Sequence, residues 1–181
     1  MICDKNLCTG CTACYNICPK NAIKMKENEE GFLYPEIDKN KCINCDLCKK
    51  ICPINNNIEQ NKENIEVYAA TAKDNNILMN SSSGGMFTII AEPILEMNGY
   101  VYGSIFDEHL NVVHKCINSK QELIQLRGSK YVQSNLKNIF KDVKEKLKNN
   151  NYVLFSGTPC QIAGLKSFLG REYDKLYTID L

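Results

Sequence analysis

The stretch Cys8-Thr-Gly-Cys11-Thr-Ala-Cys14-Tyr-Asn-Ile-Cys18-Pro19 decides how this chain folds, because its pattern returns as Cys42-Ile-Asn-Cys45-Asp-Leu-Cys48-Lys-Lys-Ile-Cys52-Pro53. Both stretches read C-x2-C-x2-C-x3-C-P. They contain eight of the 11 cysteines of the chain. Alternating apolar segments at 22–25 and 32–37 predict two small strands between them. Residues 1–53 are therefore expected to form one duplicated module.

The cysteine spacing indicates a module that binds two 4Fe-4S clusters. In the bacterial pattern three thiolates of a repeat ligate one cluster, and the fourth cysteine ligates the other. We therefore expect the chain to fold back so that each repeat completes the other. The predicted ligand sets are Cys8, Cys11, Cys14 and Cys52 for one cluster, and Cys42, Cys45, Cys48 and Cys18 for the other.

Structural zinc and a disulfide framework are the alternatives to iron-sulfur clusters. Zinc sites usually pair two C-x2-C halves across a longer loop, which this spacing does not reproduce. The N-terminus, Met-Ile-Cys-Asp-Lys, lacks the apolar core of a secretory signal. We therefore expect a cytoplasmic protein in a reducing compartment, where disulfides are rare. Two cysteines outside the repeats are expected to be a spectator thiol, Cys3, and a core residue, Cys116.

Charge and hydropathy exclude several kinds of partner. The chain of 181 residues has 22 Lys and Arg against 21 Asp and Glu, a net charge of +1, so no basic field predicts nucleic-acid binding. The apolar runs fall far below the roughly 18 residues that a membrane helix needs. The near-neutral balance of residues 1–53 favours an electron wire that feeds an attached site over a freely diffusing carrier. The expected partner is a redox protein or sister subunit.

The composition changes after Pro53. Residues 54–66 are rich in Asn and Glu and are interpreted as a linker. From residue 67 onward the pattern predicts an α/β domain. Strands are expected at 66–72, 99–106, 111–117, 152–155 and 176–181, and helices at 84–97, 135–149 and 159–169. Because the chain stops within the last strand, we expect residues 67–181 to be a truncated domain. The predicted fold class is thus an α+β two-cluster ferredoxin module followed by an α/β domain.

Three segments of the second domain are candidates for binding a flavin, the usual device that exchanges single electrons for pairs. Residues 81–85 precede a predicted helix and could cradle a phosphate, or serve as a simple connector or cap. Residues 127–134 offer a cation in a loop, or an ordinary exposed turn. Residues 157–161 join a buried strand to a helix, where open α/β sheets bind ligands. The candidate cofactor-binding residues are Ser82, Ser83, Gly84, Gly85, Ser129, Lys130, Tyr131, Gly157, Thr158 and Gln161.

The same segment also contains Cys160, whose thiol lies near a predicted helix N-terminus and could be a metal ligand or a reactive group. No residue stands out as a catalytic proton donor. His109 and His114 are expected to be surface or hydrogen-bonded side chains.

The motifs at 82–85, 128–134 and 157–161, behind the two cysteine repeats, resemble the coenzyme F420 hydrogenase/dehydrogenase beta subunit family. The resemblance implies an oxidoreductase subunit that binds FAD and passes electrons between 4Fe-4S clusters and a deazaflavin or another small organic acceptor. It implies that Ser83, Gly84, Gly85 and Lys130 line the flavin site, and that Cys160 can help to hold a further cluster. The competing hypotheses are a non-enzymatic ferredoxin-type electron-transfer module that docks to a partner, and a scaffold with structural clusters.

Overall fold

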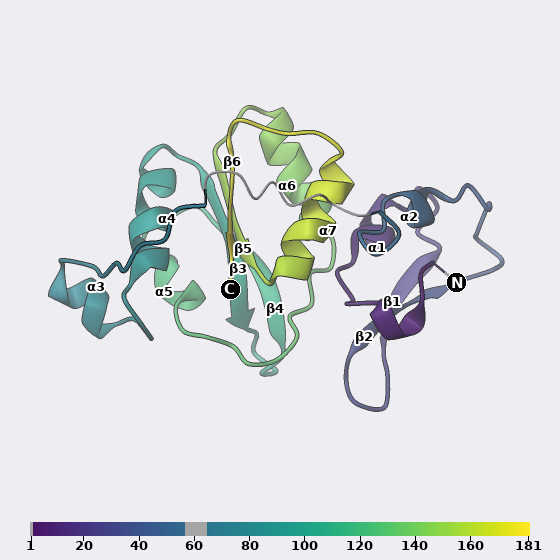
Figure 1. The fold of residues 1–181 in the computed structure, drawn as a ribbon, viewed down its shortest axis with the longest axis horizontal. Helices are drawn as coiled ribbons and strands as arrows, with labels where there is room; N and C mark the ends of the chain where they lie inside the picture. The colour runs from purple at the N-terminus through teal and green to yellow at the C-terminus, as the bar shows by residue number, and fades with distance from the viewer. Residues whose placement is uncertain (1, 57–64) are drawn as a thin grey trace.

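The computed structural model describes residues 2–56 and 65–181, which fold into two parts (Figure 1). The smaller part holds the cysteine repeats. Its elements are η1 (Lys5–Leu7), α1 (Ala13–Ile17), β1 (Ile23–Glu27), β2 (Leu33–Ile37) and α2 (Leu47–Lys50). β1 and β2 form an antiparallel hairpin in which Ile23 lies opposite Ile37. This confirms the two small strands that were predicted between the repeats.

The duplication extends to the backbone. α1 and α2 each contain the third cysteine of their repeat, and each is preceded by a residue in the left-handed conformation. These residues are Thr12 (φ 63°) and Asp46 (φ 55°), which occupy equivalent positions after the second cysteine. A left-handed non-glycine residue is uncommon. Its recurrence shows that both repeats turn their cysteine loops in the same way.

The larger part is a three-layer α/β domain (Figure 1). Its sheet has the strand order β4-β3-β5-β6, with bounds β3 Tyr100–Phe106, β4 Val112–Ile117, β5 Val153–Gly157 and β6 Leu176–Asp180. β3, β5 and β6 are parallel, and β4 is antiparallel to β3. One face packs against α4 (Met86–Glu96) and α5 (Leu123–Leu126), and the other against α6 (Ile139–Lys148) and α7 (Pro159–Leu169).

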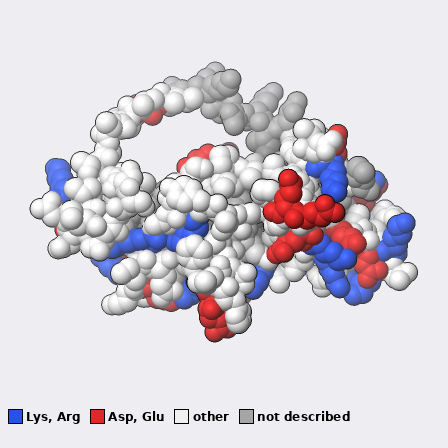
Figure 2. Space-filling view, turned by 90° about the horizontal axis from the view of Figure 1, so that it is seen from below, with Lys and Arg blue, Asp and Glu red and all other residues white. Residues whose placement is uncertain are grey.

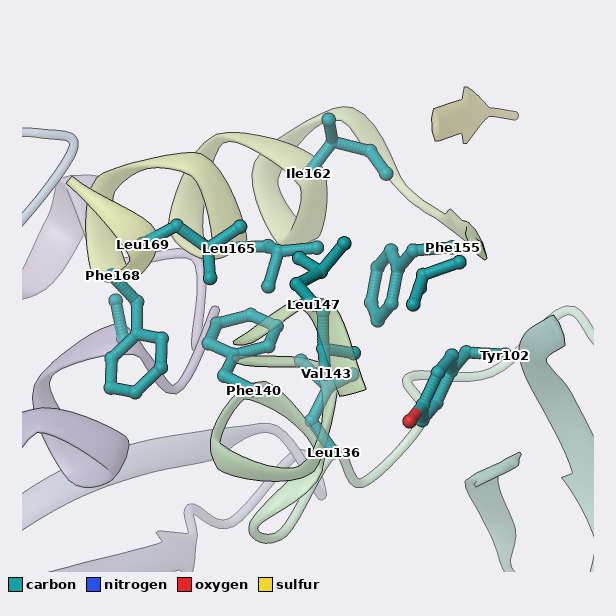
Figure 3. Packing of buried hydrophobic residues seen from close by; sticks show 12 residues of the cluster. Tyr102, Leu136, Phe140, Val143, Leu147, Phe155, Ile162, Leu165, Phe168 and Leu169 are labelled. Atoms are coloured by element: carbon teal, nitrogen blue, oxygen red, sulfur yellow. The ribbon is translucent and has the colours of Figure 1, made fainter. Parts of the chain in front are cut away.

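The central strand β5 separates the two hydrophobic layers. Val153 and Phe155 pack toward α6 and α7, whereas Leu154 packs toward α4 and α5, as the two-residue period of a strand requires. Phe140 of α6 lies among side chains of α7 and β5 in this core (Figure 3). A strand that is buried on both faces reads as a continuous apolar run, which explains why its location was predicted correctly.

Several predicted boundaries need correction. The expected strand at 66–72 is wrong: residues 65–72 contain no strand, and Val67 is 90% exposed. The predicted helix at 135–149 begins later, because Asn135 instead forms a bridge to Val113 at the edge of β4. Two short helices, α3 (Asn75–Met79) and α5, were not predicted. The expected linker at 54–66 falls largely on residues 57–64, which lie outside the described residues.

No helix in the described part of the chain combines the length and apolar character needed to cross a membrane.

Seen from the carboxyl edge of the sheet, the α/β part presents a largely uncharged surface with a short band of basic side chains, while acidic and basic side chains mix on the N-terminal part (Figure 2).

We expect Phe140→Ala to lower the free energy of unfolding by about 3–5 kcal/mol, because it removes a fully buried ring and leaves a cavity. The ring lies 6.0 Å from those of Phe155 and Phe168, centre to centre. Urea unfolding of the two proteins measures the loss. Lys141→Ala, at the exposed neighbouring position, serves as the control; an equal loss in both variants would contradict the assignment of the core.

Candidate functional site

The first predicted ligand set surrounds one cavity. Its walls include all four cysteines of that set together with apolar groups of Ile2, Met25 and Pro35. The cavity has a volume of about 20 Å³ and is partly open to solvent. The cysteines that line it are Cys8, Cys11 and Cys14 of the first repeat and Cys52 of the second. The fold thus brings the fourth cysteine of one repeat to the other repeat, as the crossed pattern predicts.

The second predicted set lies at the outer side of the N-terminal part. Cys18 and Cys45 are both close enough to Cys48 that their charges, after the effect of burial, raise the pKa of its thiol. The Cys18 sulfur accepts a hydrogen bond from the Ala22 backbone N–H at 3.3 Å. Cys45 is exposed, and Cys18, Cys42 and Cys48 are half-buried. Across residues 2–56 and 65–181, no three Cys, His, Asp or Glu side chains converge on one point as a single-ion site requires.

The first set includes buried thiols whose protons a bound metal would displace. The pKa of Cys11 is raised to about 11, first by burial and then by the charges of Cys52, Cys160 and Cys8, against a hydrogen bond from the backbone of Ala13 that lowers it. The pKa of Cys14 is also raised, by burial first and then by Cys11 and Cys8. Metal ions bind thiolates by displacing their protons, and thiolate sulfur is a preferred ligand of iron-sulfur clusters. The residues present therefore fit such a group.

Cys160 lies in the first turn of α7, beside the first cysteine set. Its sulfur is 3.1 Å from the Thr158 hydroxyl oxygen, and its thiolate would raise the pKa of Cys11. The sequence predicted the helix start but not this neighbour. The nearness of Cys11 depends on how the two parts of the chain pack, which local spacing does not encode.

The three segments predicted to bind a cofactor all lie at the carboxyl edge of the parallel strands (Figure 1). Ser82 and Ser83 are exposed ahead of α4. Gly84 packs against the segment that precedes α3, because a Cβ on Gly84 would be 2.6 Å from the Ala70 carbonyl oxygen. Gly85 caps α4 in the left-handed conformation (φ 78°). Close packing and backbone conformation therefore explain the two glycines, and the hydroxyls of the two serines remain available to bind a ligand.

In the second segment the cations differ in their availability. The Lys130 ammonium donates to the carbonyl oxygens of Arg127 and Leu126 at 2.8 and 3.2 Å, and burial lowers its pKa. Lys130 therefore caps the C-terminal end of α5. Within the described residues, the Arg127 guanidinium makes one hydrogen bond, from Nε to the Thr88 hydroxyl at 3.1 Å. An open hollow beside it is lined by Ile105, Phe106, Gln125, Arg127, Gly128, Ser129 and Lys130. Tyr131 is 94% exposed.

In the third segment Gln161 organises the start of α7. Its amide oxygen accepts from the Thr158 backbone N–H at 3.0 Å, and its amide nitrogen donates to the Ser134 hydroxyl at 2.9 Å. Gly157 is crowded, because a Cβ there would be 2.8 Å from the Gln161 amide oxygen. The second and third segments are therefore joined by a buried hydrogen bond.

His114 also lies at this edge, where it is hydrogen-bonded, one of the two alternatives expected for it, and buried, which was not predicted. It is 8% exposed, stacks on Phe155, and its Nε2 lies 2.9 Å from the Ser156 carbonyl oxygen. Within the described residues its Nδ1 has no hydrogen-bond partner. The alternation of β4, which places His114 on the same face as Val112, was the signal that could have revealed its burial.

Comparison with known protein families defines the class of protein. Residues 7–56 match the family model described as a 4Fe-4S dicluster domain, so this part is an iron-sulfur electron-transfer module. Residues 67–141 match the model described as coenzyme F420 hydrogenase/dehydrogenase, beta subunit N-term. These residues belong to the N-terminal domain of that oxidoreductase subunit family, which confirms the predicted resemblance. A search of curated proteins found no match.

We expect the stability of the protein to fall by about 1 kcal/mol between pH 7.5 and 5.5 through His114 alone. Burial lowers its pKa in the folded state to about 4 from 6.5. The unfolded chain therefore binds more protons than the folded chain in this window, and lower pH favours unfolding. Urea unfolding of the protein and of His114→Phe at both pH values measures the difference. Equal pH dependence in the two proteins would contradict a buried neutral imidazole.

Proposed function

We propose that this chain is an iron-sulfur flavoprotein subunit that passes electrons between two 4Fe-4S clusters and FAD. The observation that carries the proposal is the position of the first cysteine set, in which Cys11 lies against Gly164 of α7 in the α/β domain. Cys11 packs into the core of that domain with Ala13 and Ile17. A dicluster module that is built into the flank of the second domain is suited to serve that domain.

In this proposal Cys8, Cys11, Cys14 and Cys52 hold one cluster, and Cys18, Cys42, Cys45 and Cys48 hold the other. A bound cluster supplies a one-electron redox couple whose potential depends on burial and on hydrogen bonds to its sulfurs. The chain provides both: the Ala22 N–H donates to Cys18, and Ile2 and Met25 form an apolar wall beside the first set. Cys160 is a neighbour of the first set and a candidate further ligand.

FAD is proposed to bind at the carboxyl edge of the sheet. Bound there, it would supply the exchange between single electrons and hydride. Ser82 and Ser83 with the α4 N-terminus offer hydroxyl and N–H donors to a phosphate, and the Arg127 guanidinium offers a charge from the side. Ser129, Tyr131 and Thr158 are exposed at the same edge. Gly84, Gly85, Lys130, Gly157 and Gln161 would shape it by holding the loops, and Lys130 acts there as a capping residue.

The electron acceptor or donor on the other side of FAD is proposed to be a deazaflavin or another small organic molecule, and the protein partner a sister subunit. The second candidate function is a ferredoxin-type carrier without FAD. The engagement of the Lys130 ammonium with α5 favours it, because that charge is not offered to a phosphate. Free thiols need a reducing compartment. This supports a cytoplasmic location for either candidate function.

Quantifying iron, sulfide and flavin in the full chain, purified anaerobically, tests the proposed function. We expect both clusters and about one flavin per chain by the cofactor assignment. Arg127→Gln should lower flavin occupancy several-fold at a limiting FAD concentration, because it removes the charge beside α4. Arg171→Gln, at the other arginine of the chain, is the matched control. Iron and sulfide without flavin would support the carrier, and stoichiometric zinc without sulfide would overturn both functions.

The crossed ligand sets make a separate prediction for electron paramagnetic resonance. Cys52→Ser should change the same cluster signal as Cys14→Ser, although the two cysteines belong to different repeats. Likewise Cys18→Ser should change the same signal as Cys48→Ser. Cys116→Ser, which alters a thiol of β4 in the α/β domain, should leave both signals intact. If Cys18→Ser and Cys14→Ser affect one common signal, each repeat holds its own cluster and the crossed assignment is wrong.

A further inference from the structure

The two parts of the chain pack closely at Gly164, in the middle of α7. A Cβ at this position would lie 3.0 Å from the Cβ and 3.1 Å from the sulfur of Cys11. It would also lie 3.2 Å from the Cys11 carbonyl oxygen. Glycine within a helix is less favourable than alanine, so the helix itself gains nothing from it. The glycine serves the approach of the cysteine loop.

A second close approach fixes the same loop from its other end. A Cβ on Gly10 would lie 2.5 Å from the amide nitrogen of Gln133. The Gln133 amide oxygen accepts from the Leu33 backbone N–H at 2.8 Å, and its nitrogen donates to the Thr9 carbonyl oxygen at 3.4 Å. One side chain of the α/β domain therefore joins the cysteine loop to the β1–β2 hairpin.

Buried Asn16 provides a third attachment. Its amide nitrogen donates to the Lys137 carbonyl oxygen at 3.0 Å and to the Thr12 carbonyl oxygen at 3.1 Å. α1, which carries Cys14, packs against α6 and α7 through Ala13 and Ile17. The loop of the first set is thus seated on the α/β domain by close packing and by hydrogen bonds on both flanks.

The equivalent loop of the second repeat has a different environment. Cys45, which corresponds to Cys11, is exposed, and the neighbouring Ile43 is 56% exposed. α2, which carries Cys48, packs against α1 rather than holding a glycine contact with α7. The two ligand sets therefore have the same cysteine spacing in the sequence but different surroundings in the structure.

We propose that Gly164 is a positioning residue that seats the first cysteine set on α7 and thereby sets the redox properties of the cluster held there. The inference rests on the proposed function and adds which set communicates with the α/β domain. The set with Cys11 faces the domain, and the set with Cys45 faces outward toward a partner. Apolar surroundings disfavour the more negative reduced form, so loosening this seat raises the reduction potential of that cluster.

The test is a redox titration of the anaerobic full chain, followed by electron paramagnetic resonance. The reference variants Cys14→Ser and Cys48→Ser identify which signal belongs to which set. Gly164→Ala and Gly164→Val should each raise the potential of the first-set signal, with the larger shift for valine. The second-set potential and the iron content should stay unchanged. Lys166→Ala, an exposed position on the same helix, should change neither potential.

The outcomes separate this inference from the proposed function. Unmoved potentials in Gly164→Ala with full iron content overturn the inference, as does a shift confined to the second-set signal. Because alanine favours the helix, Gly164→Ala decides the question even if the valine variant does not fold. Absence of iron and sulfide from the unmodified chain would instead overturn the proposed function. If flavin alone is absent, the titration still decides the role of Gly164, because it follows only the two cluster signals.

Discussion

Cysteine side chains form half of the buried core of the N-terminal part, and the rest of the structure depends on this constraint. The buried cluster there consists of Ile2, Cys14, Ile23 and Cys52, so half of its members are predicted ligands. A domain this small buries too little apolar surface to be stable without a staple. Burial and mutual repulsion keep the Cys11 and Cys14 thiols protonated, and bound metal reverses that preference. Folding and metal binding of this part are therefore one equilibrium.

The α/β domain places its polar groups where its sheet opens. The parallel pairing of β3 with β5 ends at Tyr102 opposite Phe155. Beyond that point the carbonyl oxygens of Ser156 and Gly157 pair with His114 and with the Leu181 N–H. Buried backbone groups need partners, so a side chain from β4 fills the gap that the separating strands leave. The same opening creates the edge at which a ligand can reach the strand ends.

Local patterns predicted what local physics determines. The two repeats, the central strand and the amphipathic helix α6 follow from spacing and periodicity over short stretches. The strand expected at 66–72 failed because β-forming residues need a neighbouring strand, and here the described residues lie along the surface. Lys130 was predicted to line a flavin site from the motif at 128–134 and its resemblance to the family. Its residue type cannot reveal that three nearby carbonyl oxygens take up its donors.

The contacts that depend on distant segments were beyond the reach of the sequence alone. Cys11 and Gly164 are brought together only when both parts are folded, and the glycine of α7 reads as a weak point in a helix until the loop that needs it is in place.

Duplication explains how the two sites arise, and packing explains how they come to differ. Thr12 and Asp46 show that both loops adopt the same turn, so the ligand geometry of the repeats starts out alike. Only one of the two loops is covered by α7. Because potentials of iron-sulfur sites respond to burial and solvent access, covering one site is sufficient to separate their potentials without any change in ligands. In the proposed function, a cluster at the covered site holds electrons less tightly and stands beside the domain with which it exchanges them. A single helix, packed through a glycine, can thus turn a symmetric repeat into a directed path.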